Sequence, residues 1–220
     1  ENLLPILYLK GLSSSDFQSA LEDILGEGTT GLSPSSIIAL KKSWEKDFAV
    51  WKKRKITNRY VYLWADGIHV KIRLGEDRKL CLLVIIGVTE DGDKELLAVS
   101  AGYRESKDSW KDVLDDLQAR GLNTPLLAIG DGALGFWGAL REAEGFEQTA
   151  EQRCWVHKIA NVLDKLPKRI QPRAKSMLHE MMRSETLSDA NTEKDKFVAA
   201  FHEKFPEAVK KVEKDWVALT

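Results

Sequence analysis

Two aspartates in this 220-residue chain occupy positions where a carboxylate could do chemistry. Asp66 interrupts a stretch from Tyr62 to Leu74 in which every second residue is otherwise apolar, and Asp131 follows the apolar run 126–129. Hard divalent cations prefer such oxygen ligands, and two cations about 4 Å apart support phosphoryl transfer. The pair is therefore predicted to form a two-metal site. The alternatives are a bulge at Gly67 that turns Asp66 outward, or Asp-Gly pairs that only form turns.

Other motifs compete for the same segment. Gly130, Gly132 and Gly135 satisfy the G-x-G-x-x-G pattern of a dinucleotide-binding turn, but the polar residues 148–152 do not provide the next apolar strand of that fold. Cys154 and His157 have the spacing of zinc ligands, whereas a structural zinc needs four. The remaining cysteine and histidines are scattered singly along the sequence: His69, Cys81, His179 and His202. The motifs therefore favour neither a nucleotide site nor a structural zinc.

The elements that must position the two aspartates follow from hydrophobic periodicity. Strands are predicted over residues 62–74, 79–88, 95–101 and 126–129, and helices over 108–120, 133–144 and about 155–166. This order is typical of a ribonuclease-H-like α/β (α+β) fold, a mixed sheet with flanking helices. In that fold the first and fourth strands are neighbours, so Asp66 and Asp131 should meet in one site. Asp66 shares the apolar register of its strand and is predicted to face the core.

Helices are predicted before and after this region. A short helix at 16–25, a glycine-bearing turn and a second helix from Ser33-Pro34 resemble a helix-turn-helix, with a plain helical hairpin as the alternative. After Pro172 the chain is predicted to be helical to its end.

Charge is distributed in blocks, although the net charge is only −1. Residues 41–59 and 153–183 each hold eight basic and two acidic side chains, whereas residues 60–152 hold ten basic and seventeen acidic ones. Basic flanks suit the binding of a polyanion, and an acidic centre suits cations. Solvated helix faces are the alternative. The side chains predicted to contact a polyanion such as DNA are Lys41, Lys42, Lys52, Lys53, Arg54 and Lys158.

Composition excludes several classes of protein. Hydrophobic residues make up 43% and charged residues 30%, which argues against a disordered or collagen-like chain. The longest apolar run, residues 80–88, is too short to span a membrane. Two separate cysteines and no secretory leader predict a protein of the reducing cytoplasm.

Several blocks, in order, resemble the bacterial insertion-sequence transposases of the Mutator-like group. These blocks are GLSPSSIIALKKSW, YLWADGIHVKIR, LLVIIGVTEDGDKELLAVSAG, SWKDVLDDLQARGL, LLAIGDGALGFWGAL and QRCWVHKIANVLDKLP. The resemblance implies a DDE transposase that uses Mg²⁺ (or Mn²⁺) to cut transposon ends and join them to target DNA. It assigns Asp66 and Asp131 as catalytic metal ligands, and Cys154 and His157 as the family's Cys-x-x-His pair, which shapes the site and contacts DNA.

The third catalytic carboxylate is expected after Thr220, because the family places it in an Asn-Pro-x-Glu context that this chain lacks. We therefore expect a chain truncated at both ends and inactive by itself. Its parts are a DNA-binding region (1–57), a catalytic core (58–167) and a partial helical insertion (168–220). Double-stranded DNA and a second copy at synapsis are the expected partners. The rival hypotheses are a ribonuclease-H-like nuclease, a DNA-binding remnant, and an α+β domain whose aspartates only form turns.

Overall fold

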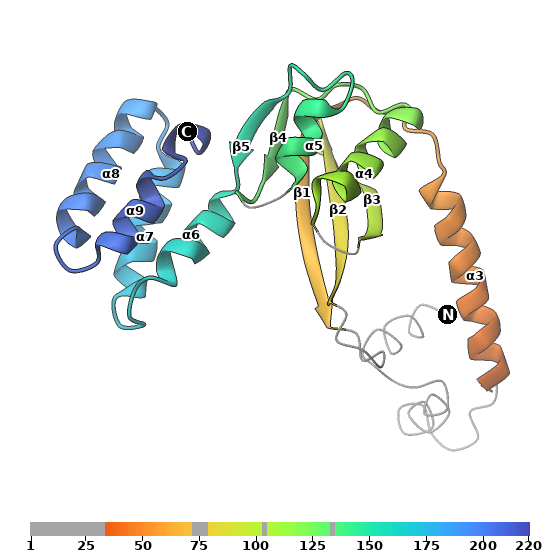
Figure 1. Ribbon diagram of the computed structural model, residues 1–220, viewed down its shortest axis with the longest axis horizontal. Coiled ribbons are helices and arrows are strands. Elements are labelled where there is room, and N and C mark those ends of the chain that lie inside the picture. The colour runs from red at the N-terminus through yellow and green to blue at the C-terminus, as the bar shows by residue number, and fades with distance from the viewer. Residues whose placement is uncertain (1–33, 72–78, 103–104, 133–134) are drawn as a thin grey trace. The chain divides into compact units, whose positions relative to one another are not determined.

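The computed structural model describes residues 34–71, 79–102, 105–132 and 135–220 (Figure 1). The chain divides into two compact units, residues 1–54 and 55–220. In the first unit the described element is the helix α3 (Pro34–Lys52), which begins at the predicted proline. The predicted helix at 16–25 and the turn after it lie outside the described residues, so the helix-turn-helix stays a prediction. Among the described helices, none combines the length and apolar character needed to cross a bilayer.

The second unit contains a five-stranded mixed sheet. Its strands are β1 (Tyr60–Lys71), β2 (Lys79–Thr89), β3 (Lys94–Gly102), β4 (Leu127–Gly130) and β5 (Ala150–Arg153). The strand order is β3-β2-β1-β4-β5, with β2 antiparallel to both β1 and β3, and β4 parallel to both β1 and β5. A meander whose first strand pairs with a later parallel strand is the ribonuclease-H-like arrangement, which confirms the predicted fold class.

The edge strand β5 was not predicted. Its sequence, Ala-Glu-Gln-Arg, is polar, and its side chains are exposed or half-buried. The strand forms because its backbone pairs with β4, from Leu127 opposite Ala150 to Gly130 opposite Arg153. The polarity of this segment was a reason to reject a dinucleotide-binding fold, and that reason was wrong. The antiparallel meander still excludes a doubly wound parallel sheet.

Two helices, α4 (Lys107–Ala119) and α5 (Phe136–Glu142), cover one face of the sheet (Figure 1). Ser106 caps α4 by accepting a 3.2 Å hydrogen bond from the Ser109 N–H, as an N-cap serine does. The helices bury Trp110, Leu114 and Phe136 in one cluster with strand residues such as Leu63 and Ile85. Burying each such side chain contributes about 1.5–3 kcal/mol. This core fixes the sheet that carries both aspartates.

A second hydrophobic cluster forms among the helices that follow the sheet. They are α6 (Trp155–Leu163), α7 (Gln171–Arg183), α8 (Leu187–Phe201), α9 (Pro206–Glu213) and the short 3₁₀ helix η1 (Trp216–Ala218). The predicted helical C-terminal region is thus observed. Val162 of α6 packs in this cluster with Leu178, Phe197 and Val212. The predicted boundary at residue 167 stays a prediction, although α6 shares its apolar face with the later helices.

Candidate functional site

Asp66 lies in β1, the central strand of the sheet. The pairing of β1 with β2 is regular from Tyr62 to Lys71, so there is no bulge at Gly67. The prediction that Asp66 faces the core was wrong, because after the register shift that follows Tyr60 the buried residues Leu63 and Ala65 lie in the other register. Asp66 shares its face with the exposed Tyr62, and its own side chain is 51% exposed. The carboxylate is therefore open to solvent and to a ligand.

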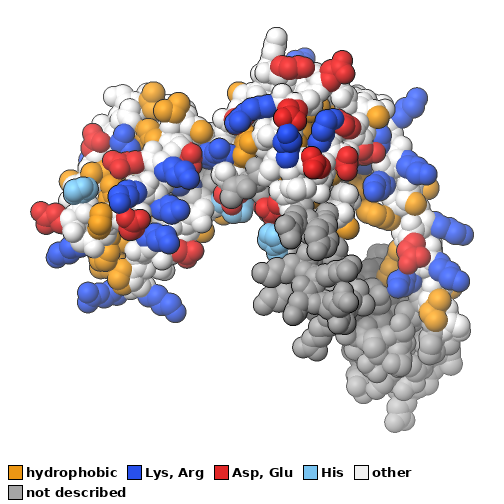
Figure 2. Space-filling model, in the orientation of Figure 1, with side chains coloured by type: hydrophobic (Ala, Val, Ile, Leu, Met, Phe, Trp, Pro, Cys, Tyr) orange, Lys and Arg blue, Asp and Glu red, His pale blue; other side chains and the backbone are white. Residues whose placement is uncertain are grey.

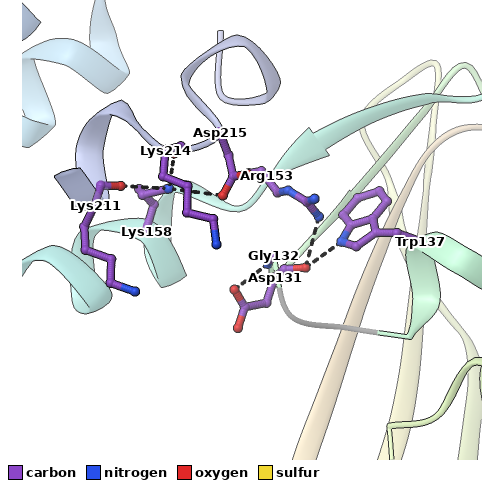
Figure 3. A network of polar contacts seen from close by, with 8 residues as sticks. All are labelled: Asp131, Gly132, Trp137, Arg153, Lys158, Lys211, Lys214 and Asp215. Atoms are coloured by element: carbon purple, nitrogen blue, oxygen red, sulfur yellow. Dashed lines mark hydrogen bonds and ion pairs between the residues drawn. The ribbon is translucent and has the colours of Figure 1, made fainter.

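Asp131 directly follows β4, and its backbone is held in place by two side chains. Trp137 Nε1 donates a 2.6 Å hydrogen bond to the Asp131 carbonyl oxygen, and Arg153 donates a 3.5 Å bond to the same oxygen (Figure 3). The Arg153 guanidinium also stacks on the Trp137 ring, 4.6 Å from its centroid. The Gly132 N–H donates a 2.5 Å bond to Asp131 Oδ1. These contacts fix the main chain and leave the second carboxylate oxygen available.

The register between β1 and β4 brings the two aspartates together. Ala65 pairs with Gly130 on the parallel neighbouring strand, so Asp66 and Asp131 each follow the last paired residue. Neighbouring strands lie about 4.8 Å apart, a separation that suits two carboxylates sharing cations. Within the described residues, no third histidine, cysteine or carboxylate completes a ligand group with them.

The Cys-x-x-His pair lies at the start of α6, next to the same strand end. The Cys154 N–H donates a 2.9 Å hydrogen bond to the carbonyl of Gly130, which fixes the entry of α6 beside β4. One turn later, His157 Nε2 lies 3.6 Å from Asp66 Oδ1. Within the described part of the chain, Cys154 and His157 are not members of a group of three potential metal ligands, and their role stays a prediction. The pair connects α6 to the end of β4, through Gly130, and to Asp66.

A basic pocket of about 330 Å³ opens beside Asp131. Strand ends and helices from both clusters build it, and its lining comprises Asp131, Gly132, Arg153, Cys154, Lys158, Asn161, Lys211, Lys214 and Asp215. Four of these side chains are cationic and two are anionic. A pocket of this charge suits an anionic group such as a phosphate.

Lys158 has a structural role that the sequence did not predict. Its side chain is buried, and its ammonium donates hydrogen bonds of 2.9 Å and 2.6 Å to the carbonyls of Lys211 and Lys214 (Figure 3). It also lies 3.6 Å from the Asp215 carboxylate. Burial lowers the pKa of Lys158, and the charge of Asp215 opposes that shift. The ammonium therefore caps the C-terminal end of α9, and little of the Lys158 side chain is exposed to solvent.

The other predicted DNA-contacting side chains belong to the first unit. Lys41, Lys42, Lys52 and Lys53 are exposed on and just after α3, and Figure 2 shows basic side chains along this helix. Arg54 instead packs on Trp51, with its guanidinium 4.6 Å from the ring centroid, and bonds the Trp51 carbonyl. Sequence reasoning missed Trp137 and Arg153, because only the folded sheet brings them to Asp131. The sequence signal that could have identified Arg153 is its position directly before Cys154, the first residue of the Cys-x-x-His pair.

The fold is ribonuclease-H-like, and it carries Asp66 and Asp131 directly after the last paired residues of β1 and β4. Over its whole length, residues 1–220, the chain matches the family described as "Transposase, Mutator family". It is 50% identical over 214 residues to the transposase for insertion sequence element IS6120 of Mycolicibacterium smegmatis, covering 97% of this chain and 65% of that protein. It is 49% identical over 203 residues to the transposase for element IST2 of Acidithiobacillus ferrooxidans, covering 92% and 68%.

The chain therefore belongs to the Mutator family of transposases, and it spans about two thirds of the length of these two relatives. Among solved structures, a chain of the simian T-cell lymphotropic virus intasome bound to a PP2A regulatory subunit is 14% identical, covering 61% of this chain and 52% of that one. The TM-score is 0.32, which is too low to describe the fold.

Proposed function

We propose that this chain carries part of the catalytic centre of a DNA transposase, which cuts the ends of its element and joins them to target DNA by metal-dependent phosphoryl transfer. The observation that supports the proposal is the parallel pairing of Ala65 with Gly130, because Asp66 and Asp131 each follow this pair on neighbouring strands. Two converging carboxylates are the ligands that a pair of hard divalent cations requires.

The residues fit Mg²⁺ or Mn²⁺ held by these two carboxylates. Asp66 is half exposed, and Asp131 keeps one carboxylate oxygen outside its bond to Gly132. When bound, such cations activate the attacking oxygen and stabilise the leaving one. His157 would orient the Asp66 carboxylate from α6, and Trp137 would fix the position of Asp131 by holding its backbone. A further carboxylate ligand would come from outside the described residues.

The basic pocket beside Asp131 would hold a phosphate of the DNA strand. Arg153 supports this role, because it lines the pocket and its guanidinium is held beside Asp131 by stacking on Trp137. Lys211 and Lys214 supply further positive charge at the pocket wall. Lys158 is left out of the proposed DNA surface, since its ammonium is already bound to α9. The exposed lysines of α3 would bind double-stranded DNA at a second place, and a second copy of the chain would hold the other transposon end.

Calorimetric titration of Mn²⁺ tests the shared site. We expect binding to the chain to disappear in the double variant Asp66→Asn, Asp131→Asn. The matched control changes two exposed aspartates, Asp91→Asn and Asp195→Asn, and should titrate like the unchanged chain. Equal titration of all three proteins would contradict the proposal.

The reaction itself is tested on DNA with the chain extended to the length of its relatives. Joined products with end-containing DNA support a transposase, and cut but unjoined products would indicate a nuclease. Binding of element ends without either product would indicate a DNA-binding remnant. In each assay Asp131→Asn is the variant expected to abolish chemistry while leaving DNA binding in place.

A further inference from the structure

Three side chains that can ligate a metal lie together near the C-terminal end of β1. None of them belongs to the pair formed by Asp66 and Asp131. His69, Cys81 and Glu105 each direct one ligand atom into a common space, and these atoms all lie within 4.8 Å of one another. The His69 Nε2 to Glu105 Oε1 distance is 3.2 Å, and the Cys81 Sγ to Glu105 Oε1 distance is 3.6 Å. We propose that these three residues bind a borderline divalent cation of the Zn²⁺ type.

The sheet brings the first two ligands together. His69 of β1 and Cys81 of β2 are direct partners across the antiparallel pair, so their side chains leave the same face of the sheet. Directly paired side chains have Cβ atoms about 4.5–5.5 Å apart, which lets both side chains reach one ion. Because this position depends on strand register, two residues that are isolated in the sequence become neighbours in the fold.

The third ligand is held in place by two glycines. A Cβ atom on Gly67 would lie 1.8 Å from Glu105 Oε1, so the glutamate crosses the strand where a side chain is missing. The Gly135 N–H donates a 3.2 Å hydrogen bond to the Glu105 carbonyl, and a Cβ on Gly135 would lie 2.7 Å from that same oxygen. The main chain at Glu105 is thus fastened to the turn after β4, and its carboxylate is directed at His69 and Cys81.

The observed distances match those between the ligands of a tetrahedral zinc ion. With zinc bonds of about 2.0 Å to nitrogen or oxygen and about 2.3 Å to sulfur, a tetrahedral angle separates N and O by about 3.3 Å, and S and O by about 3.5 Å. The remaining His69 to Cys81 distance can close by movement of the His69 side chain, which is 61% exposed. Three protein ligands leave the fourth position to water.

The ligand types select against the cation proposed for the aspartates. A thiolate and an imidazole favour Zn²⁺ over Mg²⁺, which prefers oxygen ligands alone. Without a metal, burial and the nearby charge of Glu105 raise the pKa of Cys81 to about 11, so the group is a neutral thiol that donates to Glu105. Binding forms an S–metal bond and releases the thiol proton to solvent, so affinity rises with pH.

Cobalt titration of the full chain tests the site, because Co²⁺ replaces Zn²⁺ and reports its ligands by absorption. We expect one Co²⁺ per chain, with a thiolate charge-transfer band and tetrahedral visible bands, both displaced by Zn²⁺. Cys81→Ser should abolish the charge-transfer band, and Glu105→Gln should weaken binding more than about a hundredfold. The matched control Cys154→Ser removes the only other cysteine and should leave the spectrum unchanged.

The double variant Asp66→Asn, Asp131→Asn separates this site from the proposed catalytic one. It should retain the cobalt spectrum even though it loses Mn²⁺ binding. A spectrum without the thiolate band, or a band that persists in Cys81→Ser, would overturn the proposal. Cys81→Ser is nearly isosteric, and its folding can be checked by circular dichroism; if it unfolds, the Glu105→Gln titration decides the question in the same way.

Discussion

Lys158 allows a quantitative test of how α6 is fastened to α9. Its side chain is 8% exposed, and its ammonium makes two hydrogen bonds to backbone carbonyls at the end of α9. The Asp215 carboxylate lies 3.6 Å away and is itself 29% exposed. The substitution Lys158→Met keeps most of the apolar stem and removes only the charged group.

The expected loss of stability follows from these contacts. Hydrogen bonds to charged groups contribute about 1.5–3 kcal/mol each, and removing one partner of a buried ion pair costs about 3–5 kcal/mol. Two effects reduce that cost, because the variant has no ammonium to desolvate and water can reach the part-exposed Asp215. We expect Lys158→Met to lower the free energy of unfolding by about 2–3 kcal/mol. For a unit of this size the midpoint of thermal unfolding falls by about 4–12 °C.

Urea unfolding followed by tryptophan fluorescence measures this loss, since Trp155 and Trp216 lie in the helical cluster. The matched control is Lys175→Met, an exposed lysine on α7, for which the change should stay within about 0.5 kcal/mol. Equal stabilities of Lys158→Met and the control would refute the assignment of Lys158 as a buried fastening group.

The pH dependence gives the sign of the burial effect. Burial lowers the pKa of Lys158 below its ordinary value of 10.5, so the unfolded chain binds this proton more tightly than the folded one. Between the two pKa values the stability of the unchanged protein rises with pH, and Lys158→Met lacks that rise. The cost of the substitution should therefore be larger at about pH 10 than at about pH 7. A smaller cost at the higher pH would show that the ion pair with Asp215 outweighs burial.

Three further predictions concern the neighbourhood of the two proposed metal sites. Gly135→Ala should lose about 1–3 kcal/mol in urea unfolding by overpacking, because its new Cβ would lie 2.5 Å from the Lys107 backbone nitrogen. Trp137→Phe keeps a ring but removes the bond to the Asp131 carbonyl, so calorimetry should show weaker Mn²⁺ binding with stability reduced by only about 1 kcal/mol. In metal-free protein at about pH 8, a thiol reagent should modify the half-buried Cys154 well before the buried Cys81. The rate of Cys81 modification should increase as the pH is raised toward the Cys81 pKa of about 11.

The strand order could be predicted from the sequence because the meander and the crossover helix obey general rules of chain connection. The same reasoning placed Asp66 beside Asp131, and the register of β1 with β4 agrees with it. The face of Asp66 could not be predicted, because both registers of β1 carry apolar residues and only packing shows that Leu63 is buried. The strand β5 was missed because a polar edge strand is fixed by its backbone pairing rather than by its side chains.

Interactions between distant residues were the other part that the sequence could not supply. His69 and Cys81 look isolated until the strand register makes them partners, and Glu105 joins them only because Gly67 and Gly135 leave space. Charge counting grouped Lys158 with the solvent-facing lysines, yet its ammonium is buried at the end of α9. A sequence records which charges exist, and only packing decides which of them face water.

The position of α6 links the stability of the helical cluster to the geometry of the carboxylate pair. At its start the Cys154 N–H is bonded to the Gly130 carbonyl, and one turn later His157 lies 3.6 Å from Asp66. The next residue, Lys158, points to a different side of the helix, because successive residues differ by about 100° around its axis, and it binds α9. Loosening α9 in Lys158→Met should therefore also change the contact between His157 and Asp66. Mn²⁺ binding by that variant should weaken even though no predicted ligand has changed, and unchanged binding would show that the sheet alone positions the site.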